Sequence, residues 1–384
     1  MTAIRPFRAR FLAAMLTASI CRVAGAQSAL EKGQVLERVA VRDHPEQTYA
    51  LYVPSGYTPD RPWPVLYCLD PGARGRTPVE RFAAAAEKVG VIVAGSNNSR
   101  NGPLAPSQEA INLMLLDTHE RLRIDDDRVY AAGLSGGARL ALGWAMGGHL
   151  AGVIASSAGF PNVNAPKQLP FRVYFTTGYD DFNHDELYRV SRELTARKIP
   201  HRYVEFEGGH EWLPGWLTDE ALAYLAGAVP HRAAEPSKQA EREAGEFQRR
   251  YGEIESAADG VRAGLIHQVR KDAARPADSS DRRVARRVAG SLAIGSMEQA
   301  REAMAQGQYG EAARFAEIGV LVRPENGNAW YSLALARAAT GNTKRAIEAL
   351  EQAMAHGFRN RERIEAEPLL EKVRREKKYA ELVK

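Results

Sequence analysis

The sequence between residues 128 and 142 reads Arg-Val-Tyr-Ala-Ala-Gly-Leu-Ser-Gly-Gly-Ala-Arg-Leu-Ala-Leu. Its first part, Arg128–Gly133, is typical of a buried β-strand, and its last part, from Ala138, is typical of a helix. The five residues between Ala132 and Ala138 match the pattern G-x-S-x-G. Glycines on both sides of the serine allow a tight strand-to-helix turn, which strains the serine and exposes its hydroxyl. We therefore predict that Ser135 is a nucleophile on such a turn; an ordinary helix N-cap is the alternative.

Strand-like and helix-like segments alternate on both sides of this turn, from about residue 48 to residue 230. The predicted strands are Thr48–Val53, Val65–Asp70, Gly90–Gly95, Arg128–Gly133, Gly152–Ser157, Phe171–Thr176 and Arg202–Glu207. The predicted helices are Pro78–Val89, Ser107–Leu122, Ala138–Met146, Asp185–Arg197 and Thr218–Ala226. This alternation indicates an α/β fold, in which helices cover both faces of a mostly parallel sheet.

A serine hydroxyl becomes a good nucleophile when a base removes its proton and a third group orients that base. Two later loops offer these groups: Asp180 and Asp181 follow one predicted strand, and His210 follows the next. Loops at the carboxyl ends of parallel strands form the ligand crevice of such sheets, and the order Ser, Asp, His is the one expected with this serine turn. We favour Asp181 over Asp180, because a carboxylate three residues after the turn glycine Gly178 suits the acid loop.

With these motifs in place, residues 48–228 resemble an α/β-hydrolase of the esterase branch that includes feruloyl esterases and polyhydroxyalkanoate depolymerase-like enzymes. The resemblance rests on the Ser135 turn, the loop ending at Asp181, the Gly208-Gly209-His210 run, and Asp70-Pro71-Gly72 after an early strand. It implies that Ser135 is the nucleophile, His210 the general base and acid, and Asp181 the carboxylate that orients it. It covers about half of the chain.

An enzyme of this kind also needs hydrogen-bond donors for the oxyanion of the tetrahedral intermediate. The N–H group of Gly136, at the positive end of the following helix, is the first expected donor. Many members of the resembled family have a His-Gly pair after the early strand, where this chain has Asp-Pro-Gly-Ala. We therefore expect the second donor near Gly72 or Ala73, with the loop at residues 96–102 as the alternative.

The alternation stops near residue 230, and a helical pattern follows. Residues 231–293 read as a helical connector with a polar break around residues 276–281. The run that begins at Gly307 then repeats 34 residues later at Gly341, which is the period of tetratricopeptide repeats. We predict a tetratricopeptide-like domain at 294–384 that ends in a helix near 364–382 and can bind a protein partner; an ordinary helical bundle is the alternative.

The N-terminus has the layout of a secretory signal. Three arginines precede an apolar stretch, and the small residues Ala24 to Ala26 follow it. We predict a signal peptide at 1–26, cleavage near Ala26, and a periplasmic or secreted hydrolase domain at 27–230; a lipid anchor at Cys21 is the alternative. No later apolar run reaches the ~20 residues of a membrane helix. If Cys21 is removed, Cys68 is the only cysteine left, so no intramolecular disulfide is expected.

The composition excludes several other classes. The net charge of +5 includes four arginines in residues 1–26, so the rest of the chain has no dense basic stripe for nucleic acid. The sequence lacks a phosphate loop, a dinucleotide fingerprint and zinc-ligand spacing, so no cofactor or metal is expected. The sequence therefore predicts an exported serine hydrolase that cleaves small or oligomeric esters through an acyl-enzyme. A peptidase or acyltransferase of the same fold, or an interaction protein that uses the fold as a scaffold, are the alternatives.

Overall fold

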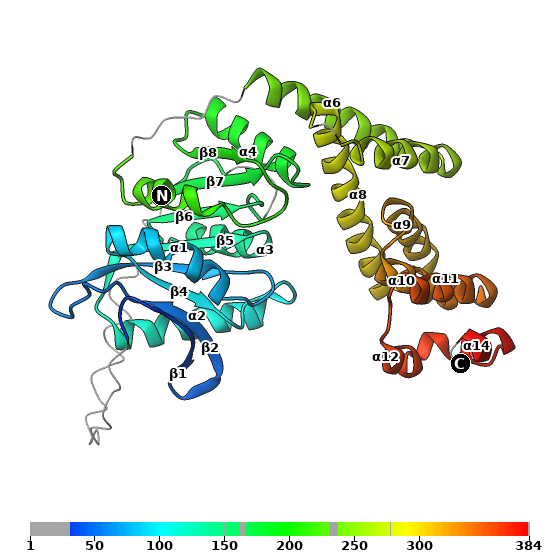
Figure 1. Cartoon of the computed structure of the whole chain (residues 1–384), viewed down its shortest axis with the longest axis horizontal. Helices are drawn as coiled ribbons and strands as arrows, with labels where there is room; N and C mark the ends of the chain where they lie inside the picture. Colours follow the sequence, from blue (N-terminus) through cyan, green and yellow to red (C-terminus); the bar gives the residue numbers. More distant parts are fainter. Residues whose placement is uncertain (1–30, 149, 162–165, 230–236, 277, 383–384) are drawn as a thin grey trace, which may run out of the picture.

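The computed structural model describes residues 31–148, 150–161, 166–229, 237–276 and 278–382. The predicted signal peptide, its cleavage point near Ala26 and the alternative anchor at Cys21 lie outside these residues. A sheet with helices on both faces makes up the first part of the chain, and a series of helices makes up the rest (Figure 1). No helix of the described residues has the length and apolar character needed to cross a membrane.

The sheet has eight strands in the order β1-β2-β4-β3-β5-β6-β7-β8. Strands β3 to β8 run parallel to one another, whereas β2 pairs antiparallel with both β1 and β4. Their bounds are β1 Val35–Val41, β2 His44–Tyr52, β3 Trp63–Leu69, β4 Ile92–Ser96, β5 Ile124–Leu134, β6 Gly152–Ser156, β7 Arg172–Gly178 and β8 Arg202–Phe206. This mostly parallel, helix-covered sheet is the α/β-hydrolase fold that the sequence predicted.

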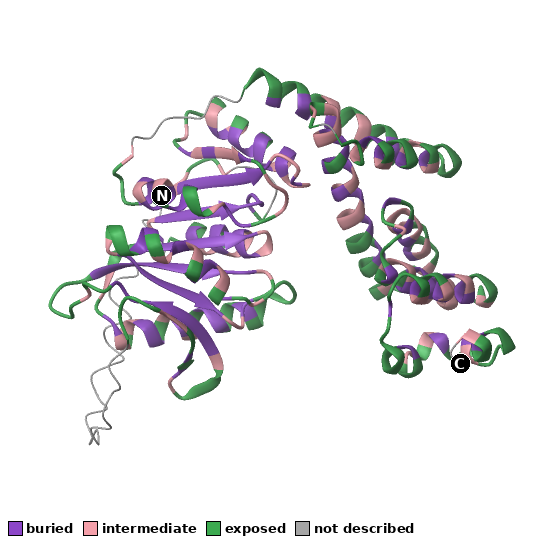
Figure 2. Ribbon diagram, in the orientation of Figure 1, coloured by how far each residue is buried: buried purple, intermediate pink, exposed green. Residues whose placement is uncertain are grey.

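Two apolar clusters fill the space between the sheet and its helices. One cluster joins the sheet to α2, α3 and α4, and the other joins it to α1 and α5, on the opposite face. The strands are therefore buried along most of their length (Figure 2). The bounds are α1 Arg76–Val89, α2 Leu104–Arg121, α3 Gly136–Met146, α4 His184–Ala196 and α5 Thr218–Leu225.

Sequence analysis did not predict the first strand. β1 reads Val-Leu-Glu-Arg-Val-Ala-Val, and the two charged residues in its centre, Glu37 and Arg38, are exposed. It pairs only with β2, at the edge of the sheet. An edge strand needs little apolar sequence because one side meets solvent, which is why its pattern is weak.

The remaining helices form the C-terminal region. They are α6 Lys238–Ser256, α7 Asp259–Ala273, α8 Ser280–Ala305, α9 Tyr309–Val322, α10 Gly327–Ala339, α11 Thr343–Ala355, α12 Arg361–Ala366, α13 Glu371–Arg374 and α14 Lys377–Leu382. They are buried in stripes, with exposed residues on their outer faces (Figure 2). Where a single final helix was predicted, α12 to α14 are three short helices, and Pro368 starts a 3-10 turn between the first two.

The two aligned segments of the predicted repeat take equivalent places. Ala312 lies near the start of α9 and Ala346 near the start of α11, and both are fully buried. The assignment of these helices to the tetratricopeptide class stays a prediction. The proposed boundary between residues 293 and 294 falls inside α8, so the connector and the repeat region share one continuous helix.

Candidate active site

Ser135 occupies a strained turn between β5 and α3. Its φ of 54° and ψ of −122° lie outside the regions that most residues adopt. A Cβ atom on Gly133 would lie 2.2 Å from the carbonyl group of Gly137, and one on Gly137 would lie 2.0 Å from Leu69 O. The turn is therefore so tight that glycine is required on both sides, as the sequence predicted, and the Ser135 side chain is left partly exposed.

His210 and Asp181 form a pair at the ends of β8 and β7. His210 Nδ1 lies 2.8 Å from Asp181 Oδ1. Asp181 is fully buried, and it also accepts hydrogen bonds from Thr177 Oγ1 at 3.1 Å and from the Asn183 N–H at 2.9 Å. Three donors thus fix the orientation of the carboxylate, and the carboxylate in turn fixes the imidazole.

The neighbouring carboxylate, Asp180, has a different partner. Its Oδ2 accepts a hydrogen bond from Arg286 Nη1 at 2.7 Å, on the outside of the loop. Asp181, and not Asp180, therefore faces His210. These contacts favour Asp181 over the alternative Asp180, and the catalytic role of the pair is a proposal.

Ser135, Asp181 and His210 follow β5, β7 and β8, so all three lie at the carboxyl edge of the parallel sheet. Among the described residues, the hydroxyl of Ser135 makes no hydrogen bond, and its pairing with His210 stays a prediction. Such contacts often become short only when substrate is bound.

Gly136 is the first residue of α3, where N–H groups have no partner within the helix. Its predicted role as an oxyanion donor fits that position. Gly72 and Ala73 fit less well, because their N–H groups are already bonded to Asp70, to Oδ1 at 2.8 Å and to the carbonyl oxygen at 3.1 Å. Neither N–H group is free to bind an oxyanion in this arrangement.

The alternative loop, residues 96–102, reaches the serine turn. The N–H of Asn101 donates to Pro71 O at 2.9 Å, and its side-chain amide lies against Gly136. A Cβ atom on Gly136 would be 1.9 Å from Asn101 Oδ1, so the amide fills the space beside the first oxyanion donor. Sequence analysis named this loop without singling out Asn101; the position of the loop after a strand at the carboxyl edge was the available signal.

Two tryptophans follow His210 in the sequence, and they differ in environment. Trp212 is buried, and its Nε1 donates to Asp70 Oδ2 at 2.8 Å, which holds the loop after β3. Trp216 is 70% exposed. Trp212 therefore stabilises the loop after β3 through its hydrogen bond to Asp70.

The described residues include no group of three or more His, Cys, Asp or Glu side chains that could hold a metal ion. The contact that the site shows is the one between the His210 imidazole and the Asp181 carboxylate. Cys68, in β3, is the one cysteine among the described residues, and its burial raises the pKa of its thiol. Because the thiol is fully buried, a substrate cannot contact it.

Comparisons with known proteins gave structural matches only. No protein-family model and no curated protein matches the chain. A fluorophosphonate-binding serine hydrolase of Staphylococcus aureus is 14% identical with a TM-score of 0.39, over 51% of this chain and 98% of that one. A ferulic acid esterase is 16% identical with a TM-score of 0.41, over 51% of this chain and 97% of that one. An esterase from the archaeon Pyrobaculum calidifontis is 12% identical with a TM-score of 0.42, over 52% and 88%. The fold assignment rests on the strand order and not on these similarities.

Proposed function

We propose that this protein is a serine hydrolase that cleaves carboxylic esters through an acyl-enzyme. The observation that carries the proposal is the Asp181–His210 pair at the same sheet edge as the strained Ser135. A buried carboxylate on Nδ1 leaves Nε2 of the imidazole to act as the base for a serine hydroxyl. The position of Ser135 on a strained turn supports a nucleophile over a helix cap.

In the proposed reaction, Ser135 Oγ attacks the ester carbonyl carbon while His210 accepts the hydroxyl proton. The negative oxygen of the tetrahedral intermediate accepts hydrogen bonds from the Gly136 N–H and, we infer, from the side-chain amide of Asn101. His210 then gives its proton to the leaving alcohol as the carbon–oxygen bond breaks. Water, deprotonated by His210, attacks the acyl group and releases the acid and the free serine.

The test is hydrolysis of short and medium p-nitrophenyl acyl esters by the full chain, together with labelling by a fluorophosphonate probe. Ser135→Ala should lower kcat by about 10⁴-fold or more and abolish labelling. Ser256→Ala, in α6 and exposed, is the matched control and should change neither. Activity and labelling that survive in Ser135→Ala would rule out this nucleophile.

Peptidase and acyltransferase reactions use the same three groups, so the class of acyl acceptor is a separate question. We expect ester hydrolysis to exceed hydrolysis of the matching p-nitroanilide, because the amide carbonyl is less electrophilic and the anilide is a poorer leaving group than p-nitrophenolate. Addition of a primary alcohol should divert the acyl group only weakly. A rate that rises several-fold with the alcohol would indicate an acyltransferase instead.

Export rests on residues 1–26 alone, whose layout supports cleavage near Ala26. Mass spectrometry of the protein from an expressing bacterium should give a mature chain that begins at Gln27. A chain that begins at a lipidated Cys21 would support the anchor instead, and an intact N-terminus would contradict export.

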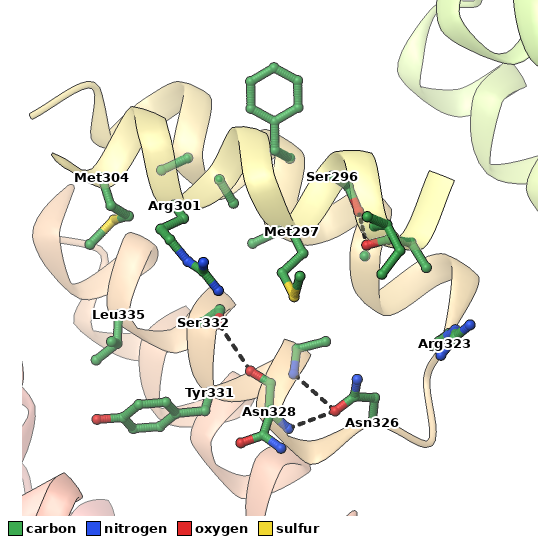
Figure 3. Close-up of a pocket in the computed structure, with 18 of the residues that line it drawn as sticks. Ser296, Met297, Arg301, Met304, Arg323, Asn326, Asn328, Tyr331, Ser332 and Leu335 are labelled. Carbon is green, nitrogen blue, oxygen red and sulfur yellow. Dashed lines mark hydrogen bonds between the residues drawn. The ribbon is translucent and has the colours of Figure 1, made fainter. Parts of the chain in front are cut away.

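A second candidate function is the binding of an acidic peptide by the helical region. A pocket of about 570 Å³ lies between α8, α9 and α10, and no Asp or Glu lines it. Its lining includes Arg301, Arg323 and Arg363, and Figure 3 shows Arg301 and Met297 pointing from α8 toward residues of α10. Cationic groups beside apolar side chains favour a partner segment with both acidic and apolar residues.

Fluorescence anisotropy with a labelled peptide of alternating Glu and Leu tests this second function. Binding should weaken at high salt and in Arg301→Glu, and it should be unchanged in Ser135→Ala. Ser135→Ala thus separates the two functions, because it should remove hydrolysis and leave peptide binding intact. If the affinity for the peptide changes neither at high salt nor in Arg301→Glu, this pocket is not the binding site.

A further inference from the structure

Helix α8 contacts the loop that carries Asp181, although more than 100 residues separate them in sequence. This acid loop comprises residues 178–184, and α8 passes beside it at the carboxyl end of β7 (Figure 1). Arg287 of α8 is fully buried, and its Nε donates to Tyr179 O at 2.6 Å. Its Nη2 also donates to Glu243 Oε2 of α6 at 2.9 Å. One side chain therefore joins α6, α8 and the acid loop.

The next turn of α8 lies against Phe182. Ser291 Oγ donates to Phe182 O at 3.0 Å. A Cβ atom on Gly290 would lie 2.7 Å from Phe182 Cβ, closer than real Cβ contacts come. The helix backbone thus approaches the loop as closely as a glycine allows.

Phe182 in turn lies on His210. The two ring centroids are 4.0 Å apart and the rings are 21° from parallel. His210 is therefore held on one edge by the Asp181 carboxylate and on one face by the Phe182 ring. Both of these residues belong to the loop that α8 contacts.

The buried arginine is poorly explained by stability alone. A charged group with no exposed surface has a large desolvation cost, and an apolar side chain of similar size is often as stable or more so. Arg287 is fully buried, and its Nη1 has no hydrogen-bond partner. What an apolar residue could not supply is the directed hydrogen bond to the carbonyl group of Tyr179, two residues before Asp181.

We propose that α8 is a positioning element of the active site, in which Arg287, Gly290 and Ser291 fix the acid loop so that Asp181 and Phe182 hold His210 in its working orientation. The inference rests on the proposed function, since it assigns the helical region a part in the same reaction. It also means that the helical region completes the site instead of merely following it. Displacement of a base by about 1 Å can lower kcat by up to about 100-fold with little change in binding.

Gly290→Ala is the main test, because it adds one methyl group at the contact with Phe182. Gly295→Ala is the matched control: it lies in the same helix, and its Cβ would be 3.8 Å from the nearest atom, Tyr251 Oη. Both variants gain the same helix propensity. We expect Gly290→Ala to lower kcat for p-nitrophenyl esters by about tenfold with KM nearly unchanged, and Gly295→Ala to keep the wild-type values.

Two readouts separate positioning from general damage. The downfield proton NMR signal of the His210–Asp181 hydrogen bond should shift or broaden in Gly290→Ala and stay in place in Gly295→Ala. Phe182→Gly removes the Cβ atom that the added methyl group would overlap, so the double variant Gly290→Ala/Phe182→Gly should lose less activity than the product of the two single effects. Arg287→Lys should retain more kcat than Arg287→Met.

A folded Gly290→Ala with wild-type kcat and an unshifted His210 signal would overturn the proposal. If Gly290→Ala does not fold, Ser291→Ala removes one hydrogen bond without adding atoms, and it should lower kcat by a few-fold; a wild-type rate would then overturn it. Failure of the proposed function looks different: the wild-type chain itself would neither hydrolyse esters nor label. In that case the positioning role falls with it.

Discussion

Glycines that a second backbone segment approaches closely are concentrated in the sheet region and rare in the helical region. In the sheet region, a Cβ atom on any of five glycines would lie within 2.4 Å of backbone in another segment: Gly75, Gly95, Gly133, Gly137 and Gly178. In the helical region, a Cβ atom would meet nothing within 4 Å at eight glycines: Gly245, Gly252, Gly260, Gly264, Gly307, Gly310, Gly341 and Gly357. Close backbone contacts are thus more frequent in the sheet region, although five glycines there also have no atom within 4 Å: Gly56, Gly102, Gly148, Gly209 and Gly215.

At two glycines of the helical region an added Cβ atom would lie closer than 3.0 Å to a neighbour, and these show where the geometry is specified most strictly. Gly290 meets Phe182 of the acid loop, and Gly327 meets backbone atoms of the turn after α11. One is a contact with the candidate active site, and the other joins successive helix pairs. At the other described glycines of the helical region, an added Cβ atom would meet nothing within 4 Å or an ordinary contact at 3.4 Å or more.

The largest effect is expected for Gly137→Ala. The added methyl group would overlap Leu69 O, which belongs to β3, so strand and helix must separate. We expect a loss of about 3 kcal/mol or more in the free energy of unfolding, measured by urea denaturation of the full chain. Gly264→Ala, with no atom near its Cβ, should instead gain about 0.5–1 kcal/mol from helix propensity. Equal effects at the two sites would remove the contrast between the regions.

A smaller effect is expected at the junction of the two regions. Burial raises the pKa of Asp185, at the start of α4, to about 6, and neither of its carboxylate oxygens has a hydrogen-bond partner. The folded protein therefore holds this proton more tightly than the unfolded chain, so the stability contribution present at low pH is lost as the pH rises to about 6.

Asp185→Asn removes that charge. It should raise the free energy of unfolding by about 2 kcal/mol at pH 7.5 and change it little at pH 4, measured by urea denaturation at both values. Glu246→Gln, in α6 of the helical region, is the control with the opposite sign: hydrogen bonds from Arg249 and Arg250 lower the pKa of Glu246 to about 2, so this variant should lose stability at pH 7.5. If Asp185→Asn is less stable than the wild type at pH 7.5, the ionised Asp185 carboxylate stabilises the fold, and the premise that burial destabilises it is wrong.

The smallest effect is expected for Gly327→Ala. Its methyl group would lie 2.7 Å from Ala353 O and His356 O, which should cost about 1 kcal/mol after the gain in helix propensity. The damage should stay local: faster proteolysis of α10 to α14 by trypsin, with ester hydrolysis unchanged. A matching loss of hydrolysis would show that the last helices, and not only α8, act on the acid loop.

The parts of the site that sequence predicted are those set by local geometry. The glycines around Ser135 mark the turn within five consecutive residues, and alternating apolar segments predict every strand of the sheet except β1. The choice between Asp180 and Asp181 was open because it depends on Arg286, far along the chain. Arg287 and Phe182 could not be predicted as parts of the site. A buried arginine cannot be told from an exposed one in the sequence, and a phenylalanine at the site cannot be told from one in the core.

Helix α8 limits how this protein can be divided or recombined. Its first half contacts the acid loop, and its second half lines the arginine-rich pocket, within 26 residues that span roughly 39 Å. A new module could be appended after α14 without disturbing the sheet. A recombination point anywhere between residues 237 and 291 would replace the part of α8 that contacts the acid loop. The sheet region and the first half of α8 must therefore be inherited together.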